Sequence, residues 1–186
     1  GIFQPFADGI KLFMKEDVIP NSSNKFLFIL GPAVAMTMAM LTSAVIPWGR
    51  EIELFGRTIP LQIADINIGI LYVFGVVSMG VYGIMIGGWA SNNKFSLLAA
   101  LRGASQMISY ELAMGLAIIA LLMLTGSLSL KTIVEQQSTG WWNIFYQPLA
   151  FIIFFVAALA ETNRHPFDLP ECESELVNGY MTEYSS

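Results

Sequence analysis

The chain has 186 residues, of which 55% are hydrophobic and 12% are charged. This charged fraction is about half that of an ordinary soluble domain, so the polar surface is too small to cover a water-soluble globule and lipid is the expected solvent. The formal net charge is −5 and the basic residues are scattered singly, so no basic patch indicates nucleic-acid binding. We expect membrane proteins and the lipid bilayer as partners.

Cys172 is the only cysteine and His165 the only histidine. A four-cysteine iron–sulfur cluster or a bis-histidine haem cannot be built from this set. We therefore expect no metal site, and any redox centre should lie in another subunit. The first residues also lack the basic region of a signal peptide, so we expect a fragment that begins and ends inside a longer protein.

The first 25 residues are too polar to span a membrane, yet they carry a regular apolar pattern. Ile10, Phe13, Met14 and Val18 recur at helical spacing among charged residues. This pattern predicts an amphipathic helix on the membrane surface over residues 1–25.

A transmembrane helix needs about 20 mostly apolar residues to cross about 30 Å of hydrocarbon. Four stretches have this length, namely 26–46, 70–89, 107–125 and 141–160. They are apolar all round, whereas a soluble core helix would carry a polar stripe. Tryptophans at the span ends fit anchors at the lipid–water boundary; they are Trp48, Trp89, Trp141 and Trp142. We predict an all-α membrane protein, a four-span helical bundle with an amphipathic N-terminal helix in one membrane domain over 1–186.

Lys and Arg are enriched on the cytoplasmic side of membrane proteins. With four spans, the start of the chain, the second loop and the end of the chain share one side. That side carries Lys11, Lys15, Lys25, Lys94, Arg102 and Arg164, and the other side carries Arg50, Arg57 and Lys131. Six against three predicts that both ends of the chain, with the acidic loop at 161–186, face the cytoplasm.

The second predicted span contains a GxxxG pair, Gly83 and Gly87, with Gly80 near the same face. Small residues at this spacing let another helix approach closely. The pair predicts helix packing and carries no functional implication.

Glu111 is the one acidic residue within the four predicted spans. A carboxylate near the middle of the membrane costs about 2.5–3.5 kcal/mol on insertion scales, so it should face the bundle interior or a hydrated cavity. Arg102 is nine residues away, which places it on the opposite face of the helix. Glu111 is therefore a candidate for proton transfer, with a glutamate that reaches the interface as the alternative.

The segment after the fourth span is unusually acidic for a membrane-adjacent loop. Its acidic residues are Glu161, Asp168, Glu171, Glu173, Glu175 and Glu183. Asp168 and Glu171 fit the start of a helix as reciprocal caps. On such a helix Asp168, Glu171 and Glu175 share a face, so their carboxylates would titrate as a coupled group. A proton relay and an ordinary solvated acidic loop both remain open, as do an ion-coupled transporter and a translocating subunit of a redox complex.

Three long motifs in this chain resemble a known family. They are GIFQPFADGIKLFMKED, GGWASNNKFSLLAALRGASQMISYE and AETNRHPFDLPECESELVNGYMTEYSS. The chain resembles, over essentially its whole length, the membrane subunit beside the quinone site of NADH–quinone oxidoreductase (respiratory complex I), often called the H subunit in bacteria. That family has about eight spans, which implies that this chain carries half of them.

The resemblance implies roles for particular residues. It links proton transfer and coupling to Glu111, Asp168, Glu171, Glu173, Glu175 and Glu183. It associates the quinone chamber or its entrance with Asp8, Lys11, Glu16, Asp17 and Arg164, of which Arg164 could pair with a carboxylate of the acidic loop. We interpret Cys172 as a small buried or interfacial side chain rather than a redox thiol. We interpret His165 as a structural histidine, with titration near neutral pH as the alternative.

The resemblance also implies the surroundings of the chain. Quinone is the expected substrate, while NADH, flavin and iron–sulfur clusters belong to partner subunits and no cofactor is bound by this chain alone. The expected place is the inner (cell) membrane. The alternatives are the homologous subunit of an energy-converting hydrogenase or formate-linked complex, and a stand-alone proton-coupled transporter, against which the lack of internal repeats argues.

Overall fold

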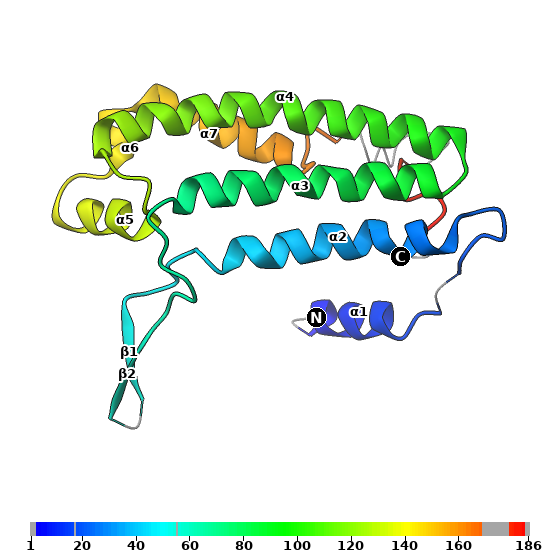
Figure 1. The fold of residues 1–186 in the computed structure, drawn as a ribbon, viewed down its shortest axis with the longest axis horizontal. Coiled ribbons are helices and arrows are strands. Elements are labelled where there is room, and N and C mark those ends of the chain that lie inside the picture. Colours follow the sequence, from blue (N-terminus) through cyan, green and yellow to red (C-terminus); the bar gives the residue numbers. More distant parts are fainter. Residues whose placement is uncertain (1–2, 17, 55, 169–178, 185–186) are drawn as a thin grey trace.

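The computed structural model describes residues 3–16, 18–54, 56–168 and 179–184. Its elements run in the order α1 (Gln4–Phe13), α2 (Lys25–Ser43), β1 (Glu51–Leu54), β2 (Arg57–Pro60), α3 (Gly69–Ala90), α4 (Lys94–Thr125), α5 (Leu130–Thr139), α6 (Asn143–Tyr146) and α7 (Pro148–Glu161) (Figure 1). The predicted helical membrane class is confirmed, and one two-stranded hairpin is added to it.

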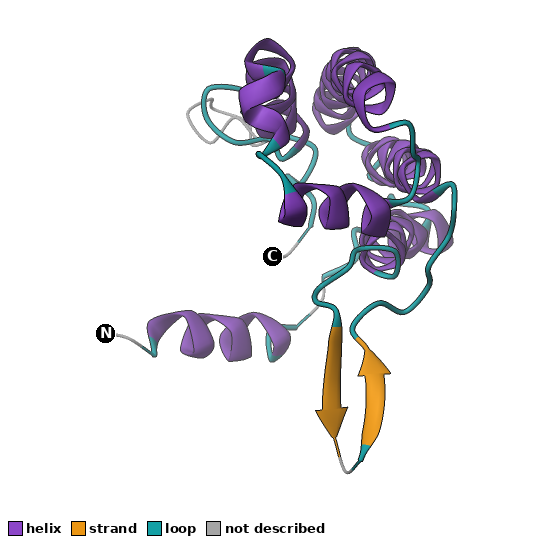
Figure 2. Ribbon diagram, turned by 90° about the vertical axis from the view of Figure 1, so that its left-hand side faces the viewer, coloured by secondary structure: helices purple, strands orange, loops and turns teal. Residues whose placement is uncertain are grey.

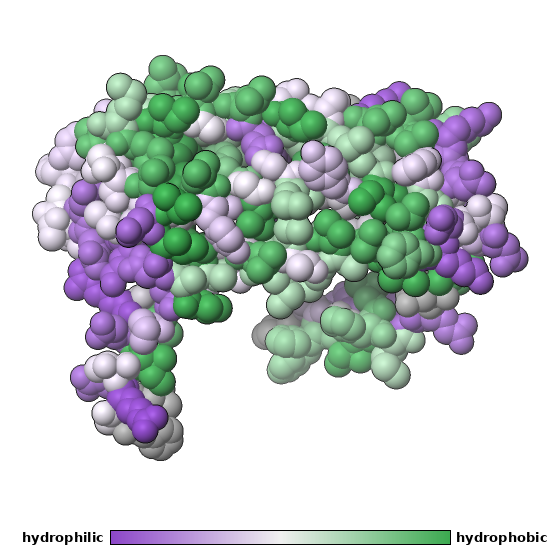
Figure 3. All heavy atoms as spheres, in the orientation of Figure 1, coloured by the Kyte–Doolittle hydropathy of each residue, from purple (hydrophilic) through white to green (hydrophobic). Residues whose placement is uncertain are grey.

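Four helices form the body of the molecule. α3 packs against both α2 and α4, and α7 packs on α4, so the long helices lie side by side as an open row (Figures 1 and 2). A small apolar cluster of Val81, Ala104 and Met107 lies between α3 and α4. Many of the large apolar side chains are exposed. Figure 3 shows hydrophobic side chains over the middle of the row and hydrophilic side chains gathered at its two ends.

Three helices, α2, α3 and α4, are long and apolar enough to cross a membrane. Together with the exposed apolar surface they identify a multi-pass membrane protein. The side chains of Trp48, Trp89, Trp141 and Trp142 are all exposed near helix ends, as interfacial anchors would be.

α4 begins well before the apolar stretch 107–125 that the sequence predicts as a span. Its N-cap is Asn93, whose side-chain oxygen accepts a hydrogen bond from the backbone N–H of Phe95 at 3.0 Å. A helix of 32 residues is about 48 Å long, so α4 extends beyond a hydrocarbon core of about 30 Å. Hydropathy detects only the lipid-facing part of such a helix.

The predicted fourth span, 141–160, is divided into α6 and α7 at Gln147. Pro148 has no backbone N–H and starts α7, because proline fits the first turn of a helix but not its interior. The Gln147 side chain donates a hydrogen bond to the Ala120 carbonyl of α4 at 2.9 Å, which ties the break to the neighbouring helix. The predicted fourth span is therefore two helices of 4 and 14 residues rather than one continuous helix, and neither has the length of the three candidate spans.

The N-terminal amphipathic helix is present as α1, which buries none of its residues. Figure 2 shows α1 lengthwise while the long helices are seen end-on, so α1 runs crosswise to them. Phe13 is 93% exposed, and Phe6 and Ile10 are also exposed. α1 covers 10 of the 25 residues predicted for the amphipathic helix, and its place on a membrane surface stays a prediction.

The hairpin of β1 and β2 projects from the left-hand end of the row in Figure 1. Ile52 pairs with Ile59 in its antiparallel register, and Gly56 takes the positive φ of +75° in the turn. This hairpin was not expected from the sequence, although the alternation of charged and apolar residues over 51–54 is a strand signal.

Glycines bring α2 and α3 into close contact. A Cβ on Gly31 would lie 2.9 Å from the Gly87 Cα, and a Cβ on Gly83 would lie 2.8 Å from the Gly31 carbonyl oxygen. The GxxxG pair therefore packs against another helix, as predicted. Gly80 faces open space and takes no part in this contact.

Candidate functional site

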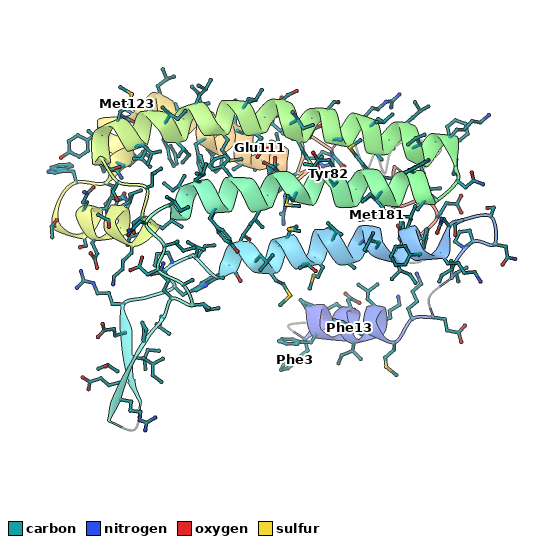
Figure 4. All side chains as sticks on the ribbon, viewed as in Figure 1. Phe3, Phe13, Tyr82, Glu111, Met123 and Met181 are labelled. Carbon is teal, nitrogen blue, oxygen red and sulfur yellow. The ribbon has the colours of Figure 1, made fainter. Side chains whose placement is uncertain are left out.

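Glu111 lies on α4 and points toward α3. Its carboxylate Oε1 accepts a hydrogen bond from the Ser78 hydroxyl of α3, and the side chain is half-buried. Figure 4 shows Glu111 between the ribbons of these two helices. Arg102 is exposed and makes no ion pair with the carboxylates of the described residues. The mid-helix carboxylate is therefore held by a neutral hydroxyl and not by a cation.

Ser78 is within hydrogen-bond distance of a second acceptor, the Phe74 carbonyl oxygen at 2.8 Å. A hydroxyl has one hydrogen and can also accept, so it can serve both protonation states of its neighbour. It donates to an ionised Glu111, or it accepts from a protonated Glu111 and donates to Phe74. The geometry of the Ser78–Glu111 contact therefore suits either form of the carboxyl group.

Glu161, the last residue of α7, is a second carboxylate near Glu111. The negative charges of Glu161 and Glu111 act on each other across the α4–α7 contact. The Oε2 atom of Glu161 is buried and has no hydrogen-bond partner among the described residues. From the sequence, Glu161 counted only as part of the acidic loop; its place as the first acid after an apolar stretch was the available signal.

The loop after α7 carries Asp168. Its side chain is 18% exposed, and the His165 Nδ1 lies 3.8 Å from its Oδ2. The peptide bond between His165 and Pro166 is cis. Arg164 is exposed and forms no ion pair with a described carboxylate, so the predicted pairing is not present within the described part of the chain.

Several predicted residues lie outside the described residues. They are Asp17, Glu171, Cys172, Glu173 and Glu175, together with the helix predicted to start at Asp168.

Residues 179–184 return to the beginning of α4. The Ser96 hydroxyl donates to the Tyr180 carbonyl at 2.9 Å, and the Asn93 amide donates to Glu183 Oε1 at 2.8 Å. Asn93 also caps α4 through its other side-chain atom, so one residue starts the helix and holds Glu183. Glu183 is therefore an anchored carboxylate at one end of the row, remote along α4 from Glu111.

Tyr184 docks on α2 at a carbonyl that its own helix cannot satisfy. Pro32 lies inside α2 and has no N–H to donate to the Phe28 carbonyl four residues earlier. The Tyr184 hydroxyl donates to that carbonyl at 2.9 Å, and the two rings stack with their centroids 4.1 Å apart. The proline therefore creates an acceptor that the C-terminal segment fills, an arrangement that was not predicted from the sequence.

The predicted entrance residues lie apart from these carboxylates. Asp8 and Lys11 are exposed on α1 and Glu16 follows it, and both ribbon views show α1 separated from α4 and α7 (Figures 1 and 2). Asp8 accepts a weak hydrogen bond from Gln4 on the same helix at 3.3 Å. Within the described ranges, no group of three or more His, Cys, Asp or Glu side chains is placed to hold a metal ion.

A family model described as NADH dehydrogenase matches residues 1–186. The chain is 68% identical over 186 residues to an NADH-quinone oxidoreductase H subunit of Cytophaga hutchinsonii and 66% identical to that of Flavobacterium johnsoniae; the match covers the whole chain but 54% and 53% of these relatives. An H subunit of the same enzyme from Geobacter sulfurreducens is 54% identical over 197 residues, and 57% of it is covered. The chain spans about half the length of the curated relatives it matches. It belongs to the NADH dehydrogenase family.

Proposed function

We propose that the chain is part of the H subunit, a membrane subunit of a proton-translocating NADH–quinone oxidoreductase. In this role it helps to form the quinone chamber and couples quinone reduction to proton transfer. The names of its relatives support the reaction, and the carboxylates on α4 and α7 support the coupling.

The observation that carries the coupling is the contact between Ser78 and Glu111 with Glu161 nearby. Reduction of a quinone consumes protons as well as electrons, so protonatable groups within the membrane are needed to deliver them. The negative charges of two neighbouring carboxylates repel each other, so the charge of one acts on the other. A proton gained by Glu161 weakens the repulsion on Glu111, and Ser78 keeps its contact in either state.

A second observation connects these groups to the acidic segment 169–178. The residues before it and after it are both hydrogen-bonded to α4, at Phe167 by Gln106 and at Tyr180 by Ser96. A change of charge at Asp168, Glu171, Glu173 or Glu175 would therefore act on the helix that carries Glu111. We propose this route for energy transfer from the quinone site toward the pumping subunits.

The proposal extends to the surroundings of the chain. Quinone is the substrate, and the electrons come from NADH through flavin and iron–sulfur clusters in partner subunits. Asp8, Lys11 and Glu16, on α1 or just after it, belong to the quinone entrance, with α1 resting on the membrane surface. The membrane is the inner (cell) membrane, with both ends of the chain and the acidic loop on the cytoplasmic side.

The test is Glu111→Gln in the full-length subunit within the assembled complex. We expect NADH–quinone turnover per assembled complex to fall at least tenfold, because glutamine keeps the shape but cannot carry a proton. Proton uptake into membrane vesicles should fall with it.

Glu53→Gln is the matched control, since Glu53 is an exposed residue of the hairpin. It should leave turnover and proton uptake within about twofold of wild type. Wild-type values of both quantities in assembled Glu111→Gln complexes would refute the coupling role.

A further inference from the structure

Gln106 is a buried polar side chain on α4 that faces α7 and the loop after it. It is 7% exposed. Its amide nitrogen donates two hydrogen bonds, to the Ala160 carbonyl at 3.1 Å and to the Phe167 carbonyl at 2.8 Å. An amide group has two hydrogens, so both bonds form at once.

Both carbonyls belong to peptide groups that lead directly into an acidic residue. Ala160 precedes Glu161, and Phe167 precedes Asp168. The peptide group is planar, so holding its carbonyl also holds the N–H and Cα of the next residue. Gln106 therefore fixes the backbone from which both carboxylate side chains start.

The ring of Tyr110 reinforces this contact. Tyr110 lies four residues after Gln106 on the same face of α4, and its ring meets the Phe167 ring edge-on at a centroid distance of 5.0 Å. α4 thus holds the loop after α7 by a hydrogen bond and a ring contact, while Glu111 follows Tyr110 directly.

Three buried oxygens of this region have no hydrogen-bond partner among the described residues. They are Gln106 Oε1, Glu161 Oε2 and Asp168 Oδ1. Each is an acceptor, and buried acceptors without a donor are unfavourable. A proton on either carboxyl group, or a water molecule between the side chains, would supply the missing donor. The titratable neighbours on the packed elements are Glu111, Tyr110 and His165.

We propose that Gln106 is a positioning residue for proton transfer, which holds Glu161 and Asp168 at a set distance from Glu111 and offers its amide oxygen to the hydrogen of a protonated carboxyl or of a bridging water. This inference rests on the proposed function. It adds a neutral amide to a proton path of carboxylates and the Ser78 hydroxyl, and it assigns α4 as the element that aligns the carboxylates.

A matched control exists at the other end of the same helix pair. Gln147 also joins α7 to α4 by donating to a main-chain carbonyl, that of Ala120 at 2.9 Å, and its Oε1 is also buried without a partner among the described residues. It has no acidic residue beside its acceptor. A purely structural role predicts similar effects of changing either glutamine.

The experiment compares Gln106→Met with Gln147→Met in the full-length subunit of the assembled complex, with rates expressed per assembled complex. Methionine keeps the length of the side chain but cannot donate these bonds. We expect Gln106→Met to lower kcat for NADH–quinone turnover roughly tenfold, with an unchanged KM for quinone and an altered pH profile. Gln147→Met should stay within about twofold of wild type, with an unaltered profile.

Gln106→Glu provides a second variant of nearly the same shape. Its carboxyl can donate a hydrogen bond only when protonated, so its turnover relative to wild type should recover as the pH falls, whereas that of Gln106→Met should not. This recovery separates hydrogen bonding from volume, and it remains measurable if the methionine variant assembles poorly.

Three outcomes would overturn the inference. These are equal effects of the two methionine variants, a rise in KM with unchanged kcat for Gln106→Met, and a Gln106→Glu activity that does not depend on pH relative to wild type. If these occur while Glu111→Gln still lowers turnover at least tenfold, only the role of Gln106 fails. If Glu111→Gln is also without effect, the proposed function itself fails.

Discussion

Ser78 on α3 donates a hydrogen bond to the carboxylate of Glu111 on α4, and the same hydroxyl lies 2.8 Å from the Phe74 carbonyl. The contact crosses between two helices within the apolar layer. A hydroxyl with a second acceptor at hand tolerates both the charged and the neutral form of the acid.

Ser78→Ala should lower NADH–quinone turnover about tenfold while the complex still assembles. The change removes a hydrogen bond to a charged group, which contributes about 1.5–3 kcal/mol. Turnover per assembled complex is the measurement. Ser109→Ala is the control, since the Ser109 hydroxyl bonds only the Ser105 carbonyl of its own helix among the described residues; an equal loss in both variants would contradict the prediction.

Gly31→Ala should destabilise the contact between α2 and α3. The added Cβ would lie 2.9 Å from the backbone of Gly87, which cannot move aside as a side chain can. Overpacking of this kind costs about 1–3 kcal/mol. The Tm of the purified complex or subunit in detergent should fall.

Gly80→Ala is the control for that experiment, since a Cβ there meets nothing within 4 Å. Replacing this glycine within a helix should be neutral or stabilising by about 0.5–1 kcal/mol. A Tm that falls equally in the two variants would show that the glycine contact is not responsible.

Tyr184→Phe should loosen the docking of residues 179–184 on α2. The variant keeps the stacked ring but loses the hydrogen bond to the Phe28 carbonyl, which contributes about 0.5–1.5 kcal/mol. Faster backbone hydrogen exchange over this segment is the readout. In a Pro32→Ala background the backbone N–H of residue 32 can donate to the Phe28 carbonyl, so Tyr184→Phe should have a smaller effect. An effect as large as in the Pro32 background would refute the proposal that the proline creates this acceptor.

The contribution of the Tyr184 hydroxyl to the stability of the docked segment 179–184 depends on pH. Burial raises the pKa of the Tyr184 hydroxyl above the ordinary tyrosine value of about 10. The stabilisation is therefore fully present below about pH 10 and is lost as the pH rises through the raised pKa. Backbone hydrogen exchange of wild type and Tyr184→Phe at each pH gives the difference in stability of the docked segment. This difference should be constant up to about pH 10 and should narrow above it.

Glu183→Gln and Glu183→Ala should separate anchoring from proton exchange. Glutamine keeps an oxygen that can accept from Asn93, so the C-terminal segment should remain docked, whereas alanine removes the acceptor. If Glu183 takes part in coupling, glutamine should lower proton uptake without faster exchange over 179–184. Faster exchange only in the alanine variant, with normal uptake in the glutamine variant, would assign Glu183 to anchoring alone.

Much of the fold was predictable because lipid imposes strong local rules. Length and apolarity identified the regions of α2 and α3 closely, and the spacing of apolar residues identified α1. The GxxxG pair indicated a close helix contact, and the AETNR and SYE motifs indicated the family. The third span was placed at 107–125, whereas α4 begins at Lys94, because hydropathy does not register the polar end of a helix. Pro148 was an overlooked sign of the break between α6 and α7.

By itself, the sequence determined that this chain is a membrane protein and which of its segments are apolar enough to cross the bilayer. It also determined which acidic residues are unusual in or beside the membrane. Each of these properties depends only on residues near one another in the sequence. Only the tertiary structure decided which groups meet. Three contacts illustrate this: Glu111 meets Ser78 and Glu161, Gln106 meets the backbone before two acidic residues, and Tyr184 meets the carbonyl freed by Pro32. The hydrogen-bonded residues in these contacts are 33 to 156 positions apart in the sequence. Such contacts arise from helix packing, and no local pattern specifies them.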